Sequence, residues 1–209
     1  MDEPGDLLPK EHTRTGRKCR CRDDVSKSIQ KAIQRLKHGD MNGLETLVYV
    51  FQTKAVRVAF LITQDEPAAE DIVQDTFIRI YQRIRFFDEA RPFEPYLMQS
   101  VVHAALNAAR QDNKVVSLDD GSSDLEDLLA RAVSPESQVE SKQLTSEILA
   151  ALSDLAPRQR AAIVQRYYLQ MSEKEMAEAL QSAPGTVKWL LNSARTRLRE
   201  LLKPGRSLK

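Results

Sequence analysis

The chain has 209 residues, 42% of them hydrophobic and 29% charged, with a formal net charge of +1. This length allows one domain or two small ones, and the hydrophobic content is enough to bury a core. We find no apolar run near the ~20 residues of a membrane span and no signal-peptide segment, so we expect a cytoplasmic protein. Cys19 and Cys21 are too close in sequence to staple a fold, which argues against a disulfide scaffold.

The charges are distributed unevenly along the chain. Residues 10–37 carry ten Lys or Arg against three acids, 117–140 carry seven acids against one Arg, and 184–209 carry seven Lys or Arg against one Glu. This layout suggests two parts that face nucleic acid, joined by a segment that avoids or mimics it. The simpler alternative, a solvated linker and charged helix ends, remains open for some of these residues.

The N-terminal half is predicted to be helical after a tail. Residues 1–24 contain Pro, Gly and charges without a hydrophobic period, and we expect a basic, disordered tail. Apolar spacing predicts helices over 25–38, 44–62 and 66–87. Residues 88–95 are predicted to form a loop, because their two prolines disfavour helix in the residues before them. A helix rich in Ala is then expected over 96–112.

The helix predicted over 66–87 has two distinct faces. Its inward face consists of Val73, Phe77, Ile80, Ile84 and Phe87. The opposite face carries polar side chains and one isoleucine: Asp71, Asp75, Ile78, Gln82 and Arg85. An isoleucine among polar residues is typical of a helix that docks onto a protein, although single exposed apolar residues are also common without any function.

The C-terminal half begins after an acidic tract broken by Gly and Pro. Residues 115–141 are therefore predicted to be a flexible linker that contains the domain boundary. Two more helices are expected over 143–155 and 158–170, and we find no convincing strand and no internal repeat. The predicted fold class is all-α, with two small helical domains over 25–114 and 142–203 and a short tail over 204–209.

The segment 172–202 has the pattern of a helix-turn-helix. Ser172 and Glu175 have the spacing of a capping box that begins a first helix. Residues 181–183 interrupt the helix, and Pro184 suits the first position of a second one. That second helix has a seam of apolar residues, namely Val187, Leu190, Leu191, Ala194, Leu198 and Leu201. Two short helices with a polar, basic second helix suit a DNA major groove, and a helical hairpin that merely packs is the alternative.

The outer face of the second helix carries side chains that can meet a phosphate or a base edge. They are Gly185, Lys188, Trp189, Asn192, Thr196 and Arg199. Trp189 could contact DNA or pack against a neighbouring helix, and we favour DNA because it lies opposite the apolar seam.

The remaining candidates for chemistry are weak. His12, Cys19 and Cys21 could bind a metal or act as a redox switch, but no second Cys/His pair follows at zinc-site spacing, and a basic tail is the preferred interpretation. His38 and His103 have no partner that suggests catalysis and are expected to be cap or surface residues. We find no paired carboxylates, phosphate-binding glycine loop or activated nucleophile, so we expect neither an enzyme nor a cofactor.

Both halves resemble the extracytoplasmic-function, or group 4, branch of the bacterial sigma-70 factors. The resemblance covers about residues 26–203 in the family's order. Its matching segments in the first half are Gly39-Asp40, AEDIVQDTF at 69–77, Phe87-Asp88, Arg91-Pro92-Phe93 and Tyr96-Leu97. Those in the second half are LSDLAPRQR at 152–160, Tyr167-Tyr168 and Gly185 to Lys188, and Ser117 to Asp120 opens the linker between them.

The resemblance implies a factor that binds core RNA polymerase, carries it to promoters and helps to open the DNA. The helix over 66–87 would dock on the polymerase β′ clamp, with the β subunit as a further contact, through Asp71, Gln74, Asp75, Ile78 and Gln82. Single-stranded −10 DNA would be bound by Arg91, Phe93, Tyr96, Arg110 and Lys114. The −35 duplex would be read by Gly185, Thr186, Lys188, Trp189, Asn192 and Arg195. An anti-sigma protein is a further candidate partner.

The chain departs from the family pattern at several positions. Tyr96 stands where Trp is usual, and Leu190 and Ser193 stand where Arg is common, which predicts weaker or different −35 reading. Gln181 replaces the usual Gly of the turn, and Ala183 replaces the usual Ser cap. The alternative function is a helix-turn-helix regulator that acts without polymerase; the AEDIVQDTF and Arg91-Pro92-Phe93 segments argue against it.

Overall fold

The computed structural model describes the backbone of residues 16–112 and 138–202, and the side chains of 24–110 and 146–202. Every regular element in these ranges is helical, which confirms the all-α prediction. The N-terminal unit comprises α1 (Gly16–Lys37), α2 (Asn42–Thr63), α3 (Glu66–Arg83), the 3₁₀ turn η1 (Ile84–Phe86) and α4 (Phe93–Asp112). The C-terminal unit comprises α6 (Gln138–Ser153), α7 (Pro157–Ile163), the π-helical turn η3 (Val164–Tyr168), α8 (Glu173–Ala179) and α9 (Pro184–Leu201).

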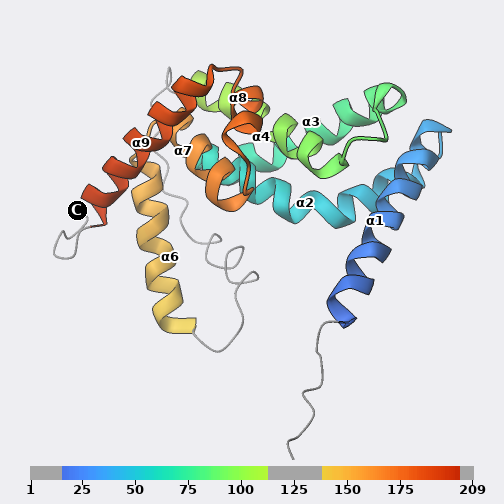
Figure 1. The fold of residues 1–209 in the computed structure, drawn as a ribbon, viewed down its shortest axis with the longest axis horizontal. Helices are drawn as coiled ribbons and strands as arrows, with labels where there is room; N and C mark the ends of the chain where they lie inside the picture. Colours follow the sequence, from blue (N-terminus) through green and yellow to red (C-terminus); the bar gives the residue numbers. More distant parts are fainter. Residues whose placement is uncertain (1–15, 113–137, 203–209) are drawn as a thin grey trace, which may run out of the picture.

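Helix α2 is the centre of the N-terminal unit. It packs against α1, α3 and α4, with α1 at one end of the molecule and α9 at the other (Figure 1). Its length and hydropathy would suffice to cross a membrane, but 56% of the relevant window is buried inside the protein. The apolar residues of α2 are therefore explained by its place in the core.

Helices α1 and α2 cross at very close range. A Cβ atom built on Gly43 would lie 2.3 Å from the backbone oxygen of Ala32, so only glycine fits at this crossing. The turn between the two helices has Gly39 at φ +88°, a left-handed conformation that glycine adopts without steric cost. Gly39 thus permits the turn that follows α1, and Gly43 permits the close packing of α1 against α2.

Three predicted boundaries were wrong, each for a local reason. Helix α1 begins at Gly16 and not at Val25, because the Arg and Lys residues over 17–22 are good helix formers even without an apolar stripe. The helix that opens at Glu66 ends at Arg83 and tightens into η1, although Phe87 is buried as predicted. Helix α4 begins at Phe93 and includes Pro95 in its first turn, where a missing N–H costs nothing.

Two further boundaries differ in the C-terminal unit. Helix α6 begins at Gln138, inside the range predicted as linker, and the rest of that linker lies outside the described residues. The helix predicted over 158–170 is α7 followed by the wider turn η3. His12 and the tail over 204–209 also lie outside the described residues, as do the side chains of Cys19 and Cys21.

The two units lie against each other. Helices α2 and α4 contact α7, α2 contacts η3, and α4 contacts α8, so the buried side chains of both units form one continuous apolar core. Gln165 of η3 is an exception within this core: its side chain is fully buried, and neither its amide nitrogen nor its amide oxygen has a hydrogen-bond partner. Such an amide destabilises the fold, because burial removes its hydrogen bonds to water and the protein provides none in their place.

Candidate nucleic-acid interface

The helix-turn-helix begins with the predicted capping box. The Glu175 backbone N–H donates to Ser172 Oγ at 3.3 Å, and the Ser172 N–H donates to Glu175 Oε2 at 2.7 Å. Hydrogen bonds from Ser172 lower the pKa of the Glu175 carboxyl, since they favour its charged form. The N–H groups of Ser172 and Glu175 are therefore satisfied within the helix's own first turn.

The turn between α8 and α9 is held from outside the motif. Gln181 has φ +46°, a left-handed conformation that costs a non-glycine residue free energy. The Arg158 guanidinium at the start of α7 donates to Ser182 Oγ, which itself donates to the Leu180 carbonyl at 2.9 Å. Pro184 opens α9, and Ala183 provides no side-chain cap, as the sequence predicts.

Helix α9 buries the predicted seam and exposes the opposite face. Leu190 and Leu191 are buried, and Trp189 is 64% exposed, so its indole is available to a partner. Gly185, Thr186, Lys188 and Asn192 are also exposed, and Arg195 is half-buried at the edge of this face. A shallow groove on α9 runs between Trp189, Asn192, Thr196 and Arg197.

The two family departures within α9 differ in exposure: Leu190 is buried, whereas Ser193 is half-buried and borders the groove beside Asn192. Leu190 belongs to the buried seam, and Ser193 Oγ accepts a hydrogen bond from Gln159 Nε2 at 2.8 Å. Gln159 Oε1 accepts from the Ala156 N–H at 3.1 Å, so this side chain joins the start of α7 to α9. Neither position supplies a cation, so the weaker or different −35 reading expected from the sequence stays a prediction.

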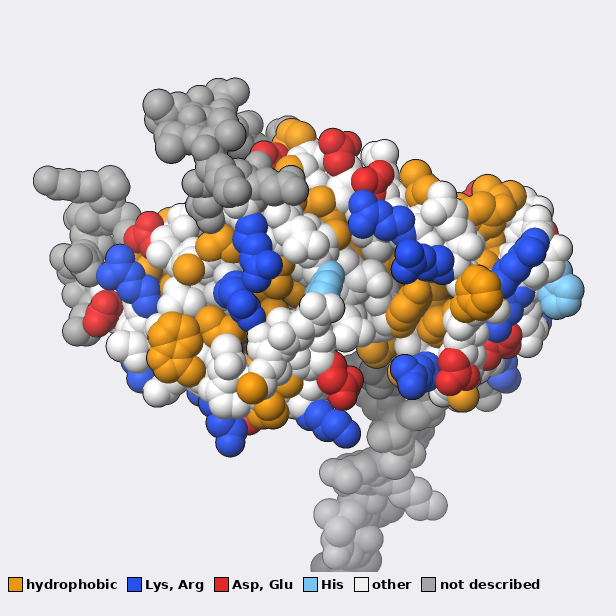
Figure 2. Space-filling view, turned by 90° about the horizontal axis from the view of Figure 1, so that it is seen from above, with side chains coloured by type: hydrophobic (Ala, Val, Ile, Leu, Met, Phe, Trp, Pro, Cys, Tyr) orange, Lys and Arg blue, Asp and Glu red, His pale blue; other side chains and the backbone are white. Residues whose placement is uncertain are grey.

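The cations of α9 differ in how they are held. Lys188 Nζ lies 3.8 Å from Glu173 Oε2, and Arg197 Nη1 lies 3.6 Å from Glu200 Oε2. Both pairs are exposed, so their loss costs little when a phosphate competes. Arg195 is held differently, by the hydroxyl of Tyr167 at 2.9 Å. Figure 2 shows Lys and Arg scattered over both units with acids between them, so no single basic field dominates that face.

The outer face of α3 is exposed as predicted. Asp71, Gln74, Asp75 and Gln82 are exposed, and Ile78 is 52% exposed among them. The helix begins at an Asp65 cap, whose carboxylate accepts the Ala68 N–H at 3.0 Å. An exposed acidic face with one apolar side chain at its centre can bind a basic partner surface.

The loop before α4 is fastened to α1 by residues that the sequence analysis did not single out. Lys37 Nζ donates to the Phe87 carbonyl at 2.7 Å and pairs with Glu89 at 2.7 Å. The hydrogen bond from Lys37 lowers the pKa of the Glu89 carboxyl. Arg91 is exposed in this loop and lies 3.7 Å from Asp88. No sequence spacing could have signalled the Lys37 contact, because it joins segments fifty residues apart.

An aromatic cluster supports the start of α4 and corrects one predicted contact. Phe93 is only 4% exposed, with its ring centroid 5.7 Å from that of Phe51 and 5.6 Å from that of Phe87. Phe93 is therefore a core residue and not a surface contact. Tyr96 is half-buried, 5.0 Å from Phe87, and offers part of its ring to solvent. Arg110 is exposed, and Lys114 lies outside the described residues.

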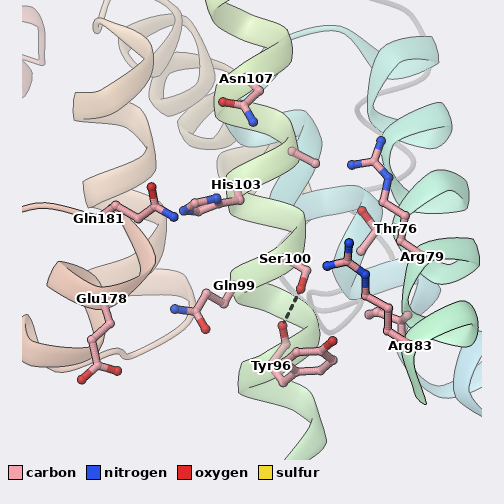
Figure 3. Close-up of a pocket in the computed structure, with 12 residues that line it drawn as sticks. Thr76, Arg79, Arg83, Tyr96, Gln99, Ser100, His103, Asn107, Glu178 and Gln181 are labelled. Atoms are coloured by element: carbon pink, nitrogen blue, oxygen red, sulfur yellow. Dashed lines mark hydrogen bonds between the residues drawn. The ribbon is translucent and has the colours of Figure 1, made fainter. Parts of the chain in front are cut away.

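A cleft of about 390 Å³ separates α3 and α4 from α8. Figure 3 shows the guanidinium groups of Arg79 and Arg83 on the α3 side, Glu178 and Gln181 on the α8 side, and the His103 imidazole pointing toward Gln181. Tyr96 lies at the floor of the cleft. Tyr96 of the candidate −10 surface and Gln181 of the helix-turn-helix turn thus line the same cleft, and His103 is a half-buried residue of its wall.

Comparison with known proteins shows the family to which both units belong. The family described as sigma-70 region 2 matches residues 47–115, and the family described as sigma-70 region 4 matches residues 145–198. The ECF RNA polymerase sigma factor SigW of Bacillus subtilis is 29% identical over 181 residues, which cover 84% of this chain and 97% of SigW. The RNA polymerase sigma-E factor of Streptomyces avermitilis is 31% identical over 170 residues, which cover 79% of this chain and 88% of that protein.

Two solved structures share the fold. CnrH in complex with the cytosolic domain of CnrY has a TM-score of 0.59 at 19% identity, covering 86% of this chain and 99% of that one. The sigma factor RpoE in complex with the anti-sigma factor NepR, from Bartonella quintana, has a TM-score of 0.55 at 21% identity, covering 78% and 98%. The chain belongs to the extracytoplasmic-function branch of the sigma-70 family of RNA polymerase sigma factors.

Proposed function

We propose that this sigma factor divides promoter recognition among three separate surfaces. The outer face of α3 binds core RNA polymerase through Asp71, Gln74, Asp75, Ile78 and Gln82. The loop before α4 and the α4 surface bind −10 DNA through Arg91, Tyr96 and Arg110, with Lys114 as a further candidate. The outer face of α9 reads the −35 duplex through Gly185, Thr186, Lys188, Trp189, Asn192 and Arg195.

The observation that carries this proposal is the exposure of each surface opposite a buried seam. Helix α3 buries Val73, Phe77 and Ile80 and leaves Ile78 exposed among acids. Helix α9 buries Leu190 and leaves Trp189 exposed. On each of these two helices a large apolar side chain and its polar neighbours are thus available together to a partner surface.

The −10 surface has the chemistry that single-stranded DNA requires. An unpaired base stacks on an aromatic ring, and the phosphate backbone needs nearby cations. Tyr96 supplies a partly exposed ring that is rigidly backed by Phe87, and Arg91 supplies an exposed cation in the adjacent loop. In this proposal Phe93 does not contact DNA but supports the Tyr96 ring from the core, where the two rings are neighbours.

The closed arrangement of the two units has to open on the promoter. Elements centred near −35 and −10 are about 25 base pairs apart, or roughly 85 Å along B-form DNA. Helices α4 and α8 contact each other with Cα atoms within 8 Å, which is incompatible with simultaneous binding of both elements. Water can solvate the polar residues that line the cleft when the units part, but the apolar contacts of α2 and α4 with α7 must also be broken. Binding to polymerase and promoter must supply the free energy for this separation.

As a sigma factor, the chain is proposed to act in the cytoplasm and without enzymatic activity of its own, guiding a polymerase that performs the chemistry. RpoE of Bartonella quintana is bound to an anti-sigma factor in its solved structure. An anti-sigma protein is accordingly part of the proposal as a regulator of this chain.

Run-off transcription with purified core polymerase tests the function directly. The full chain is added to core polymerase with a library of upstream regions from the source genome, and a reaction without the chain is the background. We expect discrete new start sites that share two spaced sequence elements. Duplex binding by the free chain, with no new start sites, would instead support a regulator that does not form a holoenzyme.

Charge reversal tests the docking surface. Asp75→Arg should abolish binding to core polymerase while the helical content stays unchanged, since Asp75 is exposed and makes only an i,i+4 pair with Arg79. Glu45→Arg, on the exposed side of α2, is the matched control and should bind core normally. Equal binding by both variants would remove the assignment of the α3 face.

A further inference from the structure

Tyr167 is an exposed aromatic residue with a specific polar contact. Its side chain is 58% exposed, and its hydroxyl accepts a hydrogen bond from Arg195 Nε at 2.9 Å. The Arg195 guanidinium carbon lies 5.8 Å from the centroid of the ring, near the outer limit for a cation–π interaction. The hydroxyl, and not the face of the ring, is therefore the main partner of Arg195.

The π-helical turn η3 explains why a tyrosine is available at this place. Tyr168 packs against the core from the same turn, whereas Tyr167 projects toward α9. An exposed ring contributes little to core packing, so its hydroxyl contact needs another explanation than stability. Wide turns of this kind often occur at functional sites.

The contact leaves the end of the Arg195 side chain free. A guanidinium has five N–H donors, and the one on Nε is used by Tyr167. The four on the terminal nitrogens remain, and among the described residues Arg195 forms no ion pair with a carboxylate. Arg197, by comparison, is paired with Glu200 at 3.6 Å on the same helix.

A free arginine side chain samples many rotamers, and this freedom is lost when it binds. Fixing Nε to a hydroxyl sets the plane of the guanidinium before any ligand arrives. A planar fork with two terminal nitrogens matches the oxygens of a phosphodiester. Arg195 lies at the half-buried edge of the α9 surface, whereas Trp189 and Asn192 are exposed nearer its centre. The edge of a recognition helix faces the DNA backbone when its centre enters the groove.

We infer that Tyr167 is a positioning residue for promoter recognition, which holds the Arg195 guanidinium ready for a backbone phosphate of the −35 duplex. This inference rests on the proposed role of α9. Tyr167 itself need not touch DNA, because its effect passes through Arg195.

A double-mutant cycle in the holoenzyme tests this inference. Wild type, Tyr167→Phe, Arg195→Ala and the double variant are each assembled with core polymerase, and their affinity for a promoter fragment is measured at several salt concentrations. Tyr167→Phe should weaken binding by about three- to tenfold. Arg195→Ala should weaken binding at least as much and reduce the slope of log K against log salt by about 1. In the Arg195→Ala background the tyrosine substitution should have no further effect.

The controls separate this inference from the proposal on which it rests. The melting temperature and helical content of Tyr167→Phe should match those of the wild type. Lys188→Ala tests α9 independently: weaker promoter binding by that variant, with unchanged binding by Tyr167→Phe, would overturn the positioning role alone. Unchanged binding by every α9 variant would overturn the α9 assignment and the positioning role together. An undiminished effect of Tyr167→Phe when Arg195 is absent would also refute it.

Discussion

Replacing Gln165 with methionine should stabilise this protein. The Gln165 side chain is 0% exposed, and its amide nitrogen and oxygen both lack a partner. A buried polar group without a hydrogen bond costs about 1–3 kcal/mol, whereas methionine has a similar length, no polar hydrogen and enough flexibility to fill the same space. We expect Gln165→Met to raise the free energy of unfolding by about 1–2 kcal/mol.

The effect is large enough for ordinary denaturation experiments. For a chain of 209 residues, 1 kcal/mol corresponds to roughly 2–4 °C in melting temperature. Thermal unfolding followed by circular dichroism should therefore show an increase of roughly 2–8 °C. Urea unfolding should show a higher midpoint with an unchanged slope, since the exposed surface of the unfolded chain stays the same.

Gln159→Met is the matched control, because Gln159 uses both ends of its amide. Its oxygen accepts from the Ala156 N–H, and its nitrogen donates to Ser193 Oγ. The same substitution should therefore destabilise the protein here, by about 1–2 kcal/mol. Destabilisation by Gln165→Met of the same size would refute the reasoning, because it would mean that the Gln165 amide is hydrogen-bonded in solution.

Four other substitutions probe the backbone and the loop before α4. Gln181→Gly should raise the unfolding free energy by about 0.5–1 kcal/mol, because it relieves a left-handed conformation at φ +46°; a lower melting temperature would instead show that its side chain stabilises the closed units. Gly43→Ala should lower the free energy of unfolding by about 1–3 kcal/mol, because the new Cβ would lie 2.3 Å from a backbone oxygen of α1. Gly185→Ala is the control: a Cβ there would have no atom within 4 Å, so urea unfolding should show an unchanged or higher stability. Glu89→Gln should destabilise the protein at neutral pH. The folded state lowers the pKa of the Glu89 carboxyl below its ordinary value of 4.5, so the ionised carboxylate stabilises the fold above that pH. This stabilisation is lost as the pH falls through the folded-state pKa. The difference in unfolding free energy between the variant and the wild type, measured by urea unfolding, should therefore become smaller as the pH falls below 4.5. A difference that does not change with pH would contradict the pairing of Glu89 with Lys37.

Local chemistry was the part of this molecule most accessible from its sequence. The capping box of α8, the proline that opens α9 and the apolar seam of α9 each depend on residues within one or two turns of each other. The two faces of α3 follow from the same helical period, and the exposed Ile78 is where that period places it. Helix type and burial could therefore be predicted, because both depend on spacing along the chain.

Contacts between distant segments were not accessible in this way. Phe93 was predicted at the DNA surface, but the rings of Phe51 and Phe87 lie against it. The packing of α2 against α4 brings Phe51 to Phe93, and Phe87 approaches from the loop before α4. The start of α1 also differed, because charged helix formers extend a helix without leaving a periodic pattern.

The amino-acid sequence by itself determined the helices, their buried faces and the family to which they belong, since these depend on local spacing and on ordered motifs. Tertiary structure alone decided which cations are held by neutral partners, as Arg195 is by Tyr167, and which are paired with acids. It also decided that α4 and α8 lie face to face across a polar cleft. The physical reason is that such contacts depend on distances in space between residues far apart in the chain, which no periodicity records.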